Sequence, residues 1–255
     1  MRLHIFTLFP EMFQGPFSAS IIKRAQEKGV VSIDLVNIRD FATDRHKTVD
    51  DYPFGGGPGM VMKPEPIFAA VERTLASLRE NSKHLRQKTV LLTPQGKRLD
   101  QKVAQDMASL TDLLLICGHY EGVDERVRKH LVEEEISIGD YVLSGGELAS
   151  MVVADAVIRL IPGVLGDQAS AQDDSYADGL LQFPQYTRPQ EFRGWQVPEV
   201  LMSGHHAEVA RWRRQQSLLR TMQRRPDLLG SAAITPEERK WLEEMLDDAE
   251  GIGRR

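Results

Sequence analysis

Cysteine is nearly absent from this chain: Cys117 is the only one among 255 residues. A single thiol cannot form an intramolecular disulfide or a cysteine-based metal cluster, so neither can stabilise the fold. The thiol ends an apolar stretch, and the sequence places no basic residue beside it to lower its pKa. We therefore expect Cys117 to be buried and structural rather than a nucleophile.

Long apolar runs are absent as well. No run approaches the roughly 20 residues that a membrane helix needs, and the first ten residues turn polar too soon for a signal peptide. Apolar residues make up 41% of the chain and charged residues 27%, with a net charge of -5. These values are typical of globular proteins and argue against a chain-wide surface for polyanions. We expect a cytoplasmic protein with no membrane association.

Three common signatures of bound nucleotides or metals are missing. No G-x-G-x-x-G motif follows an expected strand, which argues against a dinucleotide-dependent dehydrogenase. The glycine run at Phe54–Met60 is not followed by the Lys-Ser/Thr pair of a P-loop. His205 and His206 lack the spacing and partner ligands of a metal site, so no metal-binding residue is predicted.

Strands and helices alternate over the first two thirds of the chain, and the strands are continuously apolar. This pattern predicts an α/β fold with a parallel sheet that is covered on both faces. Strands are expected at residues 3–9, 30–37, 89–93, 113–117 and 136–138, and helices at 10–28, 65–81, 100–109, 123–131 and 147–160.

Three consecutive strands are expected to end in glycine-bearing turns, at Thr93–Gly96, Gly118–Gly122 and Gly139–Gly146. Parallel strands place their carboxyl ends on one edge of a sheet, so the turns are predicted to form one pocket. Two glycine breaks in Ile136–Glu147 leave backbone groups without a ladder partner. An adenosine that carries a sulfonium amino acid would satisfy them, with Glu121 binding its polar groups. A strained corner without a ligand is the alternative.

A long loop at residues 38–62 combines glycines with charged side chains. Loops of this length are usually functional or disordered. Arg45, His46 and Lys47 could contact phosphate, so we expect the loop to face a substrate, with a plain flexible turn as the alternative.

The composition changes after Leu165. Residues 166–195 are small and polar around Asp173 and Asp174, which predicts a linker that is either inert or ordered for function. Residues 196–255 are predicted to be helical. One helix is rich in arginine, including Arg211 and Arg214, and its companion is acidic. A phosphate-binding face and a solvated, salt-bridged helix pair both fit these charges.

Six segments of the chain form long, specific motifs. They are Thr48–Asp51 with the following Gly-Gly-Gly-Pro-Gly-Met, Gly118–Arg126, Ile136–Glu147, Ile161–Gly166, Tyr186–Pro189 and Ser203–Glu208. These motifs resemble those of bacterial tRNA (guanine-N1)-methyltransferases, and the resemblance covers nearly the whole chain from Leu3 to about Leu229. One departure is His119, where some members have Arg, and its role stays open.

The resemblance implies a SPOUT-type α/β fold with a deep trefoil knot and a small C-terminal all-helical domain. It implies a homodimer that binds S-adenosylmethionine in the knot and methylates N1 of the guanosine just 3′ of the tRNA anticodon, at position 37. It also implies Mg²⁺, at a site that the sequence does not locate. The implied domains are 1–165 for the cofactor, 166–195 as the linker that carries the catalytic Asp, and 196–255 for tRNA.

Roles for individual residues follow from the same resemblance. Asp174 matches the general base and Arg159 the arginine that stabilises charge on guanine O6. Asp50 would help to accept the target base, beside the phosphate contacts expected of Arg45, His46, Lys47, Arg211 and Arg214. The expected cofactor residues are Thr93, Pro94, Gly96, Gly118, Tyr120, Glu121, Ile138, Gly139, Asp140, Tyr141, Val142, Leu143, Gly145 and Gly146.

Two other classes of protein remain as alternatives. Another nucleotide-using α/β enzyme, such as a dehydrogenase, would bind NAD and ignore S-adenosylmethionine. A non-catalytic RNA-binding protein would bind tRNA without turnover, and it would not need three glycine turns around one pocket.

Overall fold

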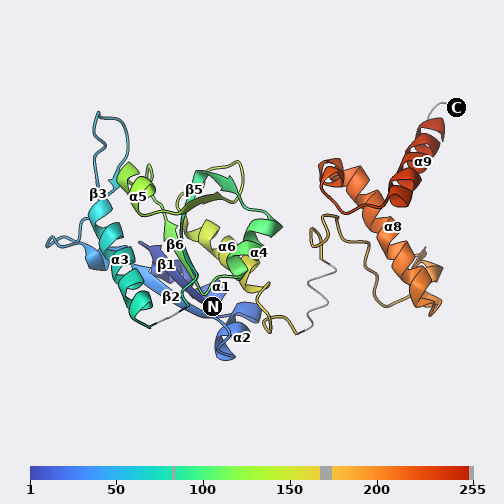
Figure 1. Cartoon of the computed structure of the whole chain (residues 1–255), viewed down its shortest axis with the longest axis horizontal. Coiled ribbons are helices and arrows are strands. Elements are labelled where there is room, and N and C mark those ends of the chain that lie inside the picture. Colours follow the sequence, from blue (N-terminus) through green and yellow to red (C-terminus); the bar gives the residue numbers. More distant parts are fainter. Residues whose placement is uncertain (82–83, 167–173, 253–255) are drawn as a thin grey trace. The chain divides into compact units, whose positions relative to one another are not determined.

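The computed structural model describes residues 1–81, 84–166 and 174–252. The chain divides into two compact units, Met1–Gly166 and Asp167–Arg255 (Figure 1). The expected linker begins at residue 166, and its residues 167–173 lie outside the described residues.

A five-stranded sheet forms the centre of the first unit, and all of its pairings are parallel. The α/β fold with a parallel sheet is therefore confirmed, while the trefoil knot stays a prediction from the resemblance. The strand order is β2 (Ser32–Asn37), β1 (Arg2–Thr7), β6 (Asp112–Cys117), β5 (Gln87–Arg98) and β7 (Glu134–Ser137).

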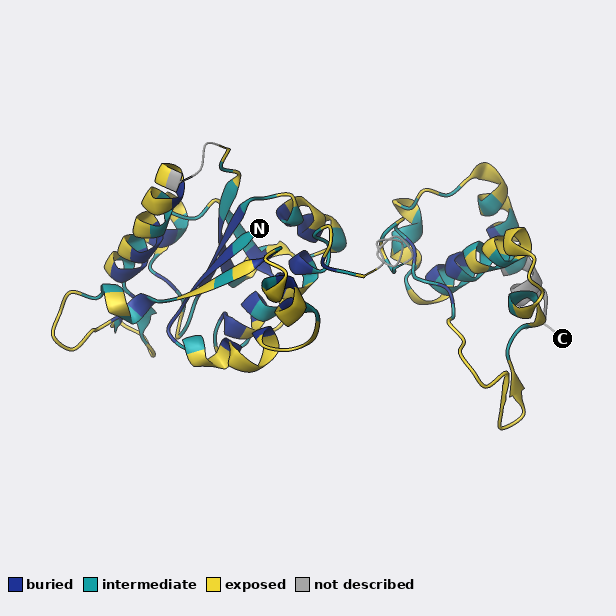
Figure 2. Ribbon diagram, turned by 90° about the horizontal axis from the view of Figure 1, so that it is seen from below, coloured by how far each residue is buried: buried dark blue, intermediate teal, exposed yellow. Residues whose placement is uncertain are grey.

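The central strand β6 is buried along its whole length, because helices cover both faces of the sheet (Figure 2). Leu113, Leu115 and Cys117 pack into one apolar cluster, and Leu114 and Ile116 into the other. This alternation explains why the strand reads as a continuous apolar run. The first cluster includes α2 (Ser20–Glu27), α4 (Gln101–Ala108) and α6 (Glu147–Ile158), and the second includes α3 (Pro64–Asn81) and α5 (Glu125–His130).

The expected helix over residues 10–28 is wrong as a single element. It is divided into the 3₁₀ turn η1 (Pro10–Phe13), the short helix α1 (Gln14–Phe17) and α2. The chain is extended at Ala19, and Ser20 has a φ of 52°, so no continuous helical ladder can pass through this point.

The turn expected at Thr93–Gly96 is also wrong, because these residues belong to a strand. Strand β5 continues to Arg98, and its pairing with β7 shifts register between Leu92 and Lys97. A Cβ on Gly96 would lie 2.4 Å from the backbone nitrogen of Ile136. This glycine therefore allows two strands to approach closely, and no reversal of the chain requires it.

We predict that Gly96→Ala lowers the free energy of unfolding by about 3 kcal/mol, because the added methyl group collides with backbone that cannot rotate away. Urea denaturation followed by circular dichroism measures the loss. Gly15→Ala is the matched control, since nothing lies within 4 Å of its Cβ position. Equal stability of Gly96→Ala and wild type would show that the strands can separate without cost.

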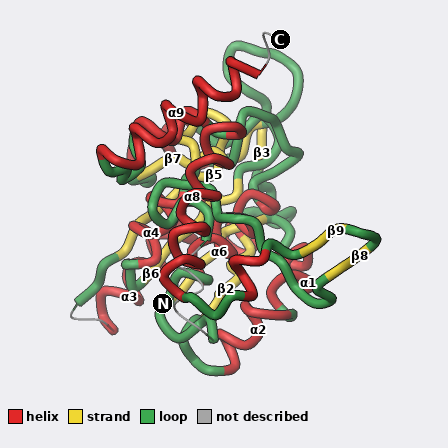
Figure 3. Tube along the Cα trace, turned by 90° about the vertical axis from the view of Figure 1, so that its right-hand side faces the viewer, coloured by secondary structure: helices red, strands yellow, loops and turns green. Residues whose placement is uncertain are grey.

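The second unit contains two long helices and a small β-hairpin that the sequence did not indicate (Figure 3). Its core contains Leu180, Leu218 and Leu242. Its elements are β8 (Glu191–Phe192), β9 (Trp195–Gln196), the 3₁₀ turns η3 (Glu199–Met202) and η4 (Pro226–Gly230), and the helices α8 (His206–Arg224) and α9 (Pro236–Ile252).

Part of the expected linker belongs to this second core. Leu180 is 1% exposed, and the backbone N–H of Leu181 donates to Thr221 Oγ1 at 2.8 Å. Arg220 donates to the carbonyl oxygen of Gln182 at 3.1 Å. The segment after Asp174 is therefore fixed on α8.

Candidate functional site

A cavity of about 350 Å³ lies where β5, β6 and β7 meet the start of α6. Its walls come from three stretches that are far apart in the sequence: Leu91–Gln95, Gly118–Val123 and Ile136–Gly146. The second stretch follows the carboxyl end of β6, and the third begins in the last two residues of β7 and continues beyond it. Parallel sheets bind ligands at this edge.

Backbone hydrogen bonds join these walls. The N–H of Gly146 donates to the carbonyl oxygen of Gly118 at 2.7 Å, and His119 forms an antiparallel bridge with Gly145. A Cβ on Gly146 would lie 2.7 Å from the Cα of Cys117. Only glycine therefore permits the end of β6 and the start of α6 to approach this closely.

The loop at residues 53–60 reaches the same cavity wall. The N–H of Glu121 donates to the carbonyl oxygen of Met60 at 3.0 Å, and the N–H of Met62 donates to the carbonyl oxygen of Gly122 at 2.9 Å. A Cβ on Gly59 would lie 2.5 Å from Glu121 Oε1. The Glu121 side chain thus occupies space that only a glycine leaves open.

A buried polar pair supports the cavity from behind. Thr7 at the end of β1 donates its hydroxyl to Glu147 Oε1 at 2.7 Å, and Glu147 is 2% exposed. Burial raises the pKa of the Cys117 thiol well above its ordinary value, and the nearby Glu147 carboxylate raises it further. Cys117 is therefore buried and held as a thiol, which confirms the structural role expected for it.

Comparison with known proteins identifies the family. The family model for tRNA (Guanine-1)-methyltransferase TrmD matches residues 1–231. The chain belongs to this family. A protein of Pelotomaculum thermopropionicum named tRNA (guanine-N(1)-)-methyltransferase is 58% identical over 246 residues, which cover 96% of each chain. A protein of the same name from Geobacillus kaustophilus is 56% identical over 250 residues, covering 98% of this chain and 100% of its own.

Most residues predicted to bind the cofactor line the cavity, although their role as ligands stays a prediction. The exceptions are Gly96, which packs against the backbone of β7, and Asp140, which is exposed outside the lining. Sequence reasoning missed Gln95, Ser137 and Arg128. Arg128 reaches the cavity from α5 by bonding Glu135 and Thr93 Oγ1, a path that no local motif reveals.

The two residues predicted to be catalytic lie in different units. Arg159 follows the last residue of α6, where its N–H donates to the carbonyl oxygen of Asp155 at 3.2 Å. Asp174 lies in the second unit, where it lines a cavity of about 250 Å³ with Arg213 and Arg214.

The loop predicted to face a substrate has local structure. It contains the 3₁₀ turn η2 (Ile38–Phe41) and a small hairpin in which Asp50 of β3 (Asp50–Asp51) pairs with Met62 of β4 (Val61–Met62). Hydrogen bonds from the Thr48 hydroxyl and N–H lower the pKa of Asp44 and order the turn beside it. Arg45, His46 and Lys47 are exposed, and Lys47 pairs with Asp40 at 3.0 Å.

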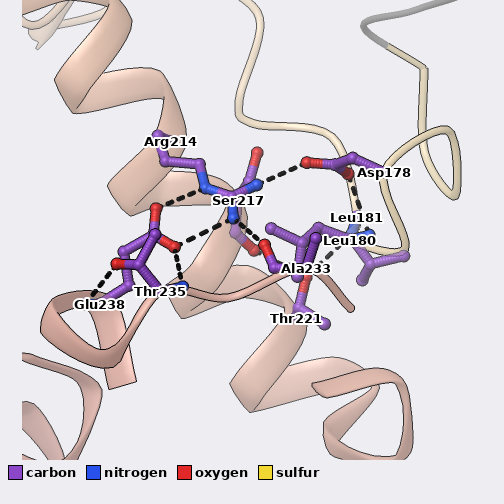
Figure 4. A network of polar contacts seen from close by, with 9 residues as sticks. All are labelled: Asp178, Leu180, Leu181, Arg214, Ser217, Thr221, Ala233, Thr235 and Glu238. Carbon is purple, nitrogen blue, oxygen red and sulfur yellow. Dashed lines mark hydrogen bonds and ion pairs between the residues drawn. The ribbon is translucent and has the colours of Figure 1, made fainter. Parts of the chain in front are cut away.

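Arg211 and Arg214 differ although both lie on α8. Arg211 is exposed. Arg214 donates to Glu238 Oε1 at 2.7 Å, to Asp178 Oδ2 at 2.5 Å and to the carbonyl oxygen of Ala233 at 2.6 Å (Figure 4). The Glu238 bond raises the pKa of Arg214, and the same bond lowers that of Glu238. Arg214 therefore joins α8 to α9, as in the salt-bridged alternative, and its direct contact with tRNA stays a prediction.

Within residues 1–81, 84–166 and 174–252, no three His, Cys, Asp or Glu side chains are grouped so that they could hold a metal ion. None of the helices there combines the length and apolar character that crossing a membrane requires.

We predict that Arg214→Ala lowers the free energy of unfolding of the second unit by about 2 kcal/mol, because two carboxylates and a carbonyl lose their shared donor. All three tryptophans, Trp195, Trp212 and Trp241, lie in this unit, so their fluorescence during urea denaturation reports it selectively.

Arg211→Ala is the control, since it removes the same charge from the same helix and should change stability by less than about 0.5 kcal/mol. Equal effects of the two substitutions would mean that net charge, and not the bonds of Arg214, determines the stability of the unit.

Proposed function

We propose that this protein transfers a methyl group from S-adenosylmethionine to N1 of the guanosine just 3′ of the anticodon in tRNA. The observation that carries the proposal is the cavity built from backbone groups at the carboxyl edge of the sheet, in a chain that belongs to the tRNA (Guanine-1)-methyltransferase family. Relatives with this name match nearly the whole chain.

The cavity suits such a donor in size and chemistry. Its volume of about 350 Å³ lies within the range of small-molecule sites. Glycine backbone can bond the edges of an adenine, Leu143 and Ile138 offer apolar contact, and the Glu121 carboxylate can attract the positive end of the amino acid. When bound, S-adenosylmethionine supplies a methyl group on a positively charged sulfur.

Guanine N1 carries a proton that must leave when the methyl group is added. We assign its removal to Asp174, and we assign Arg159 to stabilising negative charge on O6. An aspartate in water, with a pKa of roughly 3.9, is a weak base for this step. Contact with bound RNA would remove water from the carboxylate and make it a stronger base. The rigid walls of the cavity contribute by orientation.

The division of residues between units suggests how the site is completed. Asp174 belongs to the second unit, whereas the cavity and Arg159 belong to the first. We propose a homodimer in which Asp174 of one subunit serves the cavity of the partner, once tRNA is bound.

Contacts with tRNA are proposed for the exposed cations of both units. Arg45, His46 and Lys47 would bind phosphate beside Asp50, which would accept the target base, and Arg211 would bind phosphate from α8. Magnesium was expected from the family resemblance, but the described residues offer no group of three suitable ligands.

The function is tested by incubating the protein with S-adenosylmethionine that carries a labelled methyl group and a tRNA transcript with guanosine after the anticodon. We expect the label on N1 of that guanosine. Transfer to another atom or nucleotide, or none at all, would overturn the proposal.

We predict that Asp174→Ala lowers the rate of methyl transfer by about 10²–10⁴, because the proton on N1 loses its acceptor. Single-turnover kinetics at saturating tRNA and S-adenosylmethionine measure the effect. The control is Asp173→Ala, which removes the neighbouring carboxylate and should retain most activity. Appreciable transfer by a correctly folded Asp174→Ala variant would refute the assignment of the base.

We predict that Gly59→Ala weakens S-adenosylmethionine binding about tenfold, because the new methyl group displaces the Glu121 carboxylate. Isothermal titration calorimetry measures the dissociation constant. Gly56→Ala is the control for backbone strain: Gly56 has a φ of 77°, close to the 81° of Gly59, but nothing lies within 4 Å of its Cβ position. Equal losses in both variants would show that strain, and not Glu121, is responsible.

A further inference from the structure

A cavity of about 450 Å³ lies within the second unit, between the segment at residues 183–190 and the start of α8. It is separate from the cavity at the sheet edge, which belongs to the first unit. The mechanism proposed above does not use it.

The walls of this cavity combine polar side chains with apolar and aromatic ones. Phe183, Leu201, Met202 and Val209 contribute apolar surface. Tyr186 also lines the cavity. Tyr186 is 49% exposed, and Met202 is 45% exposed. An aromatic ring left this open beside a cavity is a ready surface for stacking a flat ligand.

The charge of the cavity has one sign. Among the described residues that line it, the charged ones are Arg188 and Arg213. The Arg213 guanidinium lies over the Phe183 ring, 4.8 Å from its centroid, so this cation is held in the wall. Two cations next to an aromatic ring complement a ligand with both a flat base and a phosphate.

The wall segment is fixed at both ends. At one end, Arg220 and Thr221 of α8 hold Gln182 and Leu181. At the other, the N–H of Val197 donates to the carbonyl oxygen of Gln190 at 2.9 Å and closes the β8–β9 hairpin. These bonds hold both ends of the wall segment, which lowers the cost of ordering it when a ligand binds.

The position of the cavity relates it to the reaction. Phe183 and Arg213 also line the neighbouring cavity that contains Asp174. The two cavities thus share part of their walls, and Asp174, to which we assign the proton transfer, lines the smaller one.

We propose that this cavity binds one unpaired nucleotide of the substrate RNA, with its base stacked on Tyr186 and its phosphate near Arg188 and Arg213. The inference rests on the proposed function and extends it, because it names a second point at which the RNA loop is held. Such a contact would distinguish a loop with an unpaired base from continuous duplex.

The test compares the binding of an unmodified tRNA transcript to wild type and variants by filter retention. Tyr186→Ala should weaken binding about tenfold, which is typical for loss of one stacked base. Tyr186→Phe keeps the ring and should bind within twofold of wild type. Phe192→Ala is the matched control, since it removes an exposed aromatic ring from the neighbouring hairpin that does not line the cavity.

A second set of transcripts, each lacking one base in the loop, identifies the nucleotide. At one position, loss of the base should make wild type and Tyr186→Ala bind equally. No such position, or binding of the intact transcript by Tyr186→Ala within twofold of wild type, would overturn the inference. A change in the sedimentation of Tyr186→Ala without RNA would also overturn it, because a second copy of the chain would then fill the cavity.

Methyl transfer by wild type in the same preparation separates this inference from the proposed function. If wild type methylates guanine N1 and Tyr186→Ala binds tRNA normally, the inference that this cavity binds a nucleotide is refuted and the proposed function stands. If wild type transfers no methyl group, the proposed function fails whatever the binding results.

Discussion

The site in the first unit depends on the close approach of two backbones at the end of β6. Gly146 donates to the carbonyl oxygen of Gly118 at 2.7 Å, at a point where even a methyl side chain would meet the Cα of Cys117. This contact fixes the start of α6 against the sheet. With the start of α6 held in this place, most of the stretch from Ile136 to Gly146 lines the cavity.

The same contact determines the electrostatics of the cavity. The amino end of a helix usually attracts anions. Here Glu147, in the first turn of α6, places a buried carboxylate behind that end, where Thr7 bonds it. The negative charge offsets the positive end of the helix dipole, so the opening is less suited to phosphate. Arg128, the cation in the cavity wall, is bonded to Glu135, and the Glu121 carboxylate also lines the cavity, which is compatible with the cationic methyl donor proposed above.

Local patterns predicted the parts of the fold that local chemistry controls. Apolar runs indicated the buried strands, and the helix expected from residue 100 is α4, which Asp100 caps by accepting from the N–H of Val103. Contacts between distant segments could not be predicted in this way. Gly96 was interpreted as part of a turn, because nothing in the sequence shows that β7 lies against it. The bonds of Arg214 could not be predicted for the same reason. Composition cannot distinguish an arginine that donates to Glu238 and Asp178 from an exposed one such as Arg211.

Asp174 and the cavity at the sheet edge belong to different units of the chain, which has a consequence for selectivity under the proposed mechanism. A base fixed beside the methyl donor would let any nucleophile that entered the cavity react. With the base in the second unit, catalysis also requires that unit to be placed by the RNA that it holds. Binding energy from distant RNA contacts, including a stacked loop nucleotide, is then used to assemble the reacting groups. Discrimination among RNAs therefore appears in the rate of methyl transfer as well as in affinity, and a short guanosine-containing fragment should react slowly even at saturation.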